Sequence, residues 1–239
     1  MINRRHIRVK VMQSVYALIT SNSDNLVKEE NFLKNSIEKM YDLYVLLIDT
    51  LPRIKNLAEE HIEISKKKHF ATKEDLNPNT KFIENKLVAL LEESISLQTF
   101  KEERELDNWN LEEKYIRTIY EHLIKSAMYK KYIESENRSF KEDVEFIVDV
   151  YSEFIAPNEK LADYFEDLNI SWVDDIPFVN TWVVKTLQNL KENKTLSLGR
   201  IYKDDDDKKF VQDLFRKTVL NHLEFEKDIE NKTPNWETD

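Results

Sequence analysis

The residues best suited to bind a ligand lie together at the N-terminus of the chain. Arg4, Arg5, Arg8 and Lys10 all precede the first acidic residue, Asp24. The rest of the sequence holds 32 Lys and Arg against 46 Asp and Glu, and the net charge of the whole chain is -10. A basic end on an acidic chain is typical of a local contact with nucleic acid, because cationic side chains displace counterions from phosphates. The chemistry that these residues offer is phosphate binding.

No comparable pattern indicates catalysis or metal binding. The chain has one glycine, Gly199, and no cysteine, which excludes glycine-rich phosphate loops, thiolate metal sites and disulfides. None of the five histidines has glutamate three positions before it, and the sequence HExxH is absent. Adjacent carboxylates such as Glu102-Glu103 and Asp174-Asp175 are typical of solvated helix faces and helix caps. We therefore predict a protein that is not an enzyme, with no catalytic residue, no metal site and no cofactor.

The composition predicts an all-α fold. Hairpins and tight strand connections need glycine for backbone angles with positive φ, and this chain of 239 residues has only one. No apolar run approaches the roughly 20 residues of a membrane span, and no apolar signal core follows the basic residues. Together with the absence of cysteine, this pattern predicts a cytoplasmic protein with no membrane contact.

The basic residues are expected to lie on a helix from about Arg5 to Ile19. Its apolar face is marked by the i, i+4, i+8, i+11 spacing of Ile7, Val11, Val15 and Leu18. On this phase Arg8 falls inside the apolar arc, where an ion pair with another helix or a role in binding are both open. Lys10 and Gln13 fall on the opposite, polar face, and Arg4 and Arg5 precede the first full turn.

Further helices are expected along the rest of the chain. The pattern indicates a helix that ends or kinks at Pro52, a loop from His69 to Thr80, and a loop from Lys191 to Tyr202. Ser139 and Glu142 have the spacing of a capping box. A last helix carries apolar residues from Phe210 to Leu223, and the four aspartates 204–207 before it suit a helix N-terminus.

Two stretches resemble a known family. The phrase RRHIRVKVMQSVYAL, from Arg4 to Leu18, is similar to the opening of the NusB transcription antitermination family, an arginine-rich arm that runs into a helix with Gln, an aliphatic residue and Tyr. The weaker likeness, Phe210 to Val219, is to the helix that opens the family's second helical bundle. The resemblance implies a single NusB-like helical domain over 1–239. In it, 1–22 would be the RNA-binding arm and first helix, 23–203 a large helical insertion, and 204–239 the start of the second bundle.

The resemblance also implies a function. NusB proteins act with the ribosomal protein NusE on boxA elements of leader transcripts, within the antitermination complex of RNA polymerase, and support ribosomal RNA transcription and processing. By matching position, the RNA-binding residues would be Arg4, Arg5, Arg8, Lys10 and Gln13.

The family's C-terminal motif of the type Phe-Val-Asn-Gly-Val-Leu-Asp does not occur before Asp239, so we expect a fragment or shortened form. A fragment would leave apolar surface uncovered on the helix from Phe210 to Leu223, which favours self-association. Two other functions stay open. One is a helical adaptor that binds only protein, and the other is an accessory domain of an RNA methyltransferase.

Overall fold

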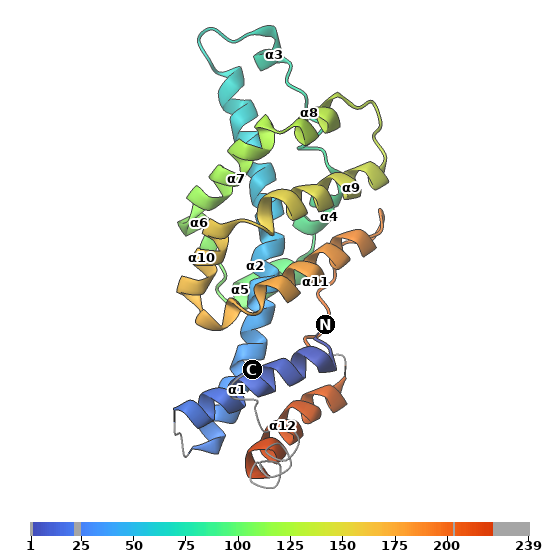
Figure 1. The fold of residues 1–239 in the computed structure, drawn as a ribbon. Helices are drawn as coiled ribbons and strands as arrows, with labels where there is room; N and C mark the ends of the chain where they lie inside the picture. Colours follow the sequence, from blue (N-terminus) through green and yellow to red (C-terminus); the bar gives the residue numbers. More distant parts are fainter. Residues whose placement is uncertain (1, 22–24, 203, 222–239) are drawn as a thin grey trace. The chain divides into compact units, whose positions relative to one another are not determined.

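The computed structural model describes residues 2–21, 25–202 and 204–221, and nearly all of its ordered structure is helical (Figure 1). In these ranges β-structure is limited to two isolated bridges, so the predicted all-α class is confirmed. The chain forms two compact units, Met1–Lys39 with Gly199–Asp239 and Met40–Leu198. We call them unit 1 and unit 2. The division into two units reflects contacts within the folded chain and does not show whether a segment was inserted during evolution. The insertion predicted over 23–203 therefore stays a prediction.

Unit 1 brings together helices that are far apart in the sequence. Helix α1 (Arg4–Thr20) packs beside α12 (Asp205–Leu220), and the first part of α2 (Leu26–Lys66) belongs to the same unit. The two helices begin together, because the amide of Ile2 donates to the carbonyl of Ile201 at 2.9 Å directly before them. The core of unit 1 consists of apolar side chains that are almost fully buried: Ile2, Ile7, Val11, Leu33, Ile37, Val211 and Phe215.

Polar caps set the start of both terminal helices. The side chain of Asn3 accepts a hydrogen bond from the amide of His6, and that of Asp204 accepts one from the amide of Asp207. Each cap satisfies an amide that has no partner within its helix. The predicted role of the aspartate run as a helix N-terminus is confirmed, and the predicted first helix agrees with α1 to within one residue at each end.

Unit 2 contains the rest of α2 and nine shorter α-helices. They are α3 (Lys73–Leu76), α4 (Lys86–Glu92), α5 (Ile95–Glu103), α6 (Asn108–Leu111), α7 (Glu113–Lys125), α8 (Ala127–Glu134), α9 (Phe140–Val150), α10 (Glu159–Leu168) and α11 (Ile176–Asn189). A π-helical turn, Tyr151–Ile155, follows α9, and a 3-10 turn, Ile170–Trp172, precedes α11. In the described part of the chain, no helix is both long and apolar enough to cross a membrane.

Helix α2 supplies much of the core of unit 2. Its side chains at Leu43, Leu46 and Ile48 are almost fully buried, and each such side chain contributes about 1.5–3 kcal/mol. Polar contacts also fix neighbouring helices to it. The indole N–H of Trp109 donates to the carbonyl of Leu46 at 2.9 Å, and Arg104 makes two parallel hydrogen bonds of 3.0 Å to Asp42.

A buried lysine joins the segment before α4 to α8 and α9. The side chain of Lys81 is 1% exposed, and its Nζ donates to the carbonyl of Ser135 and to Glu142 Oε2, each at 3.0 Å. The ammonium lies 4.3 Å from the centre of the Tyr132 ring, whose hydroxyl donates to Asp143 at 2.6 Å. Burial, followed by the bond to Asp143, raises the pKa of Tyr132, which keeps this hydroxyl protonated as a donor.

Several sequence predictions for unit 2 are corrected. Of the two alternatives predicted at Pro52, an end or a kink, the end is wrong, because α2 continues through Pro52 to Lys66. The predicted loop from His69 to Thr80 contains α3, because Thr72 and Asp75 form a reciprocal capping box. At the predicted box before α9, Ser139 caps the amide of Glu142, whereas the Glu142 carboxylate binds Lys81 and the Ser135 hydroxyl instead of returning to the cap. Helices α5, α6 and α8 were not predicted.

Candidate nucleic-acid interface on helix α1

Helix α1 separates the five predicted RNA-binding residues. Arg4, Arg5 and Arg8 are exposed in its first turns, Lys10 is buried, and Gln13 is half-buried. The three arginines therefore remain candidates for contact with a ligand. The other two lie away from the exposed face.

Arg4 is held by α12. Its Nε lies 2.9 Å from Asp207 Oδ1, and its guanidinium carbon lies 5.1 Å from the centre of the Phe210 ring. The hydrogen bond that Arg4 donates to Asp207 is the main cause that raises the pKa of Arg4, and the charges of Asp204 and Asp206 add to it. The aspartates at the start of α12 therefore offset part of the positive charge at the start of α1. The charge count of the sequence alone does not reveal this neutralisation.

Arg8 does not lie in the apolar arc where the sequence placed it. It is exposed, and its guanidinium carbon lies 5.8 Å from the centre of the Phe210 ring. A cation–π contact at an exposed site contributes about 0.5–1 kcal/mol. The loss of about 3–5 kcal/mol expected for a buried ion-paired arginine therefore does not apply to Arg8.

Lys10 also differs from its predicted position, but in the opposite direction to Arg8. Its exposed fraction is 3%, although the sequence placed it on the polar face. The residues that α1 buries are Ile7, Lys10, Val11 and Ser14, at i, i+3, i+4 and i+7. Lys10 lies three residues after Ile7 and four before Ser14, so it belongs to the buried face of the helix.

The exposed face of α1 carries an apolar stripe that the sequence interpretation missed. Val9, Met12, Tyr16 and Ile19 are 42%, 64%, 71% and 57% exposed. With Arg5, they follow one another at intervals of four, three, four and three residues, which places them on one side of the helix. We call Arg5, Arg8 and these four residues the α1 face. The spacing of these exposed apolar residues is visible in the sequence. The buried stripe through Ile7 and Val11 has the same helical period, so the period does not distinguish the exposed stripe from the buried one.

The α1 face can bind anions at its first turns and apolar or aromatic groups along the rest of its length. Two exposed guanidinium groups suit phosphate oxygens, which they can contact through paired N–H donors. The described residues contain no group of three or more His, Asp or Glu side chains placed to hold a metal ion. Comparisons with protein-family models, curated proteins and solved structures find no match to the chain.

Proposed function

We propose that this protein is an RNA-binding transcription antitermination factor that acts with NusE on boxA-type leader RNA within the RNA polymerase antitermination complex, and so supports ribosomal RNA transcription and processing. One observation carries the proposal. The phrase that resembles the NusB arm forms α1, and two of its arginines, Arg5 and Arg8, are exposed on one face of that helix. Each can neutralise a phosphate of a single strand.

The acidic residues of the chain limit how strongly the α1 face can attract RNA. The chain carries a net charge of -10, and Arg4 is already bound to Asp207. General attraction to RNA is therefore weak, and binding depends on a small number of local contacts. We expect RNA affinity to be modest for the protein alone and to increase when NusE adds its own contacts.

The direct test is a titration of the protein, with and without NusE, against boxA-like and scrambled RNA of equal length at two salt concentrations. The proposal predicts tighter binding of the boxA-like RNA, a further increase with NusE, and weaker binding for the variant Arg5→Ala/Arg8→Ala. The variant Lys130→Ala/Lys131→Ala is the matched control, because it removes two adjacent exposed charges from α8 in unit 2. Equal affinity for both RNAs in every condition would refute the proposed role.

A second function, a helical adaptor without an RNA role, is favoured by the apolar stripe. Four exposed apolar side chains lie along one side of the helix at i, i+3, i+7 and i+10, which is the kind of apolar face by which amphipathic helices bind in protein grooves. The variant Met12→Ser/Tyr16→Ser distinguishes the two functions. An adaptor would lose its protein partner with this variant, and its affinity for RNA would be negligible from the start.

A further inference from the structure

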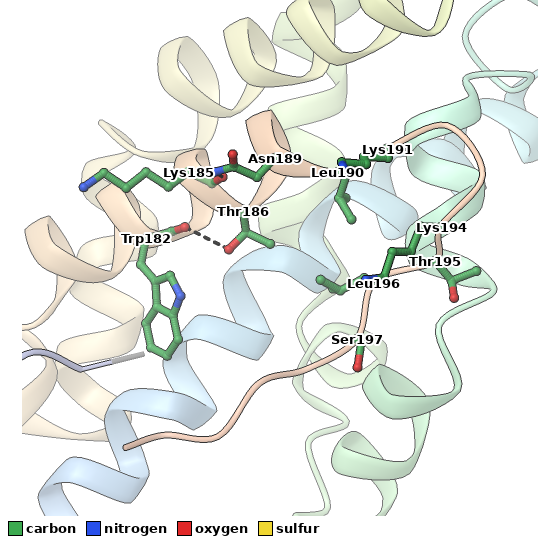
Figure 2. A pocket seen from close by; sticks show the side chains of 10 residues that line it. All are labelled: Trp182, Lys185, Thr186, Asn189, Leu190, Lys191, Lys194, Thr195, Leu196 and Ser197. Carbon is green, nitrogen blue, oxygen red and sulfur yellow. Dashed lines mark hydrogen bonds between the residues drawn. The ribbon is translucent and has the colours of Figure 1, made fainter. Parts of the chain in front are cut away.

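A hollow in unit 2 lies between the second half of α11 and the segment that follows it. Its volume is about 440 Å³, within the range of roughly 300–1,000 Å³ typical of small-molecule sites. Figure 2 shows the ten side chains that line it. Trp182, Lys185 and Thr186 come from α11, whereas Lys191 and Lys194 belong to the turn after this helix.

Hydrogen bonds fix both walls of the hollow. On the helix side, Thr186 lies 2.9 Å from the hydroxyl of Tyr44, and the Tyr44 ring stacks on Trp182 with the ring centres 4.1 Å apart. On the opposite side, the carbonyl of Leu196 accepts hydrogen bonds from the hydroxyls of Ser94 and Ser96 at 2.6 and 3.2 Å. The hollow therefore does not need to form when a ligand arrives, which lowers the entropic cost of binding.

The charge around the hollow is positive, in contrast to the chain as a whole. Three of its ten lining residues are lysines, and none is acidic. Lys185, Lys191 and Lys194 are exposed, and none of them forms an ion pair with another described residue. The one carboxylate in the turn, Glu192, lies outside the lining and pairs with Lys86 at 2.8 Å.

The C-terminus of α11 only partly opposes this charge. A helix C-terminus is equivalent to about half a negative charge, and α11 ends at Asn189 beside the hollow. The three positive charges of the lysine ammonium groups exceed this half negative charge several-fold. Each is carried on a flexible four-carbon stem and offers three donors, so the groups can turn toward a bound anion. Hydroxyls of Thr195 and Ser197 in the same lining add neutral donors, whereas the hydroxyl of Thr186 donates to the carbonyl of Trp182 at 3.0 Å (Figure 2).

We propose that this hollow binds a phosphate ester, with the phosphate between Lys191 and Lys194 and the organic group against Trp182 and Leu190. The phosphate can belong to a free nucleotide or to a single RNA strand, since both present the same anionic oxygens. The site lies wholly within unit 2 and does not depend on the function proposed for α1.

The test uses the full chain with Arg5→Ala/Arg8→Ala as background, so that binding at α1 does not contribute. Calorimetric titrations with uridine 5′-monophosphate, uridine and hexauridylate are compared in this background and with Lys191→Gln/Lys194→Gln added. Lys130→Gln/Lys131→Gln serves as the charge-matched control. Circular dichroism and thermal unfolding establish that each variant is folded.

We expect the monophosphate to bind, uridine to bind far more weakly, and Lys191→Gln/Lys194→Gln to weaken the monophosphate about five- to tenfold, with no effect of the control variant. Tighter binding of hexauridylate than of the monophosphate would identify an RNA strand as the source of the phosphate, and equal binding would identify a free nucleotide. No binding of either phosphate ligand at millimolar concentration would overturn the proposal. Equal loss of affinity in the Lys130→Gln/Lys131→Gln control would overturn it as well.

Discussion

The buried ion pair of unit 2 should respond unequally to the loss of its two partners. The side chain of Lys81 is 1% exposed, whereas that of Glu142 is 19% exposed and also accepts a hydrogen bond from Ser135. Glu142→Gln leaves a buried ammonium without a counter-ion. Lys81→Met keeps the volume of the buried chain and leaves a carboxylate that water and Ser135 still solvate.

The magnitudes follow from this difference in exposure. Removing one partner of a buried pair costs about 3–5 kcal/mol, and we expect Glu142→Gln to cost about 3 kcal/mol, because the carbonyl of Ser135 and the Tyr132 ring still contact Lys81. Lys81→Met should cost about 1–2 kcal/mol, mainly for the lost partner of that carbonyl.

Urea unfolding followed by tryptophan fluorescence measures both values. Trp109, Trp172 and Trp182 lie in unit 2 and report on its unfolding. A loss for Lys81→Met that equals or exceeds the loss for Glu142→Gln would refute this reasoning.

The pH dependence of the unfolding free energy gives an independent measurement of the stability that the Lys81–Glu142 ion pair contributes. Burial raises the pKa of Glu142, but the hydrogen bonds from Ser135 and Lys81 outweigh it, so the pKa in the folded chain lies below its ordinary value of 4.5. The stabilisation that ionised Glu142 contributes is complete above about pH 4.5, and it is lost as the pH falls through the pKa that Glu142 has in the folded chain. The difference in stability between wild type and Glu142→Gln should therefore decrease below pH 4.5.

Two further predictions concern local contacts. Asp204→Ala removes the side chain that caps the amide of Asp207, so it should lower the stability of unit 1 by about 1 kcal/mol in urea unfolding, and Asp204→Asn should retain most of it. Hydrogen bonds from the Lys68 side chain and the Thr72 backbone lower the pKa of Asp75 to about 2. Lys68→Ala should raise this pKa, as measured by nuclear magnetic resonance titration, and an unchanged value would show that Lys68 contributes nothing.

The sequence predicted the helical class and the ends of α1 because both depend on local signals. The scarcity of glycine and the apolar period of the first 20 residues are properties of the chain itself. The predicted apolar face of α1 is confirmed at Ile7 and Val11, which are buried, whereas Val15 and Leu18 are half-buried. The exposed apolar stripe through Val9, Met12 and Tyr16 was not predicted, because a periodic pattern does not show that apolar residues stay exposed.

Contacts between residues that are distant in the sequence explain the other differences between the predictions and the structure. The pairing of Arg4 with Asp207 joins positions 203 residues apart, and the burial of Lys81 depends on Glu142, 61 residues away. Neither follows from helical periodicity. Short helices such as α6 escape prediction because four residues contain no complete apolar period.

The dependence of RNA affinity on salt concentration tests the proposed role of the α1 face most directly. Each phosphate contact on a single strand contributes about 0.7 to the slope of log affinity against log salt, so Arg5→Ala/Arg8→Ala should reduce the slope for boxA-like RNA by about 1.4. The helical content should stay the same, since both side chains are exposed. A double variant with the affinity and the salt slope of the wild type would contradict the RNA-binding role of this helix.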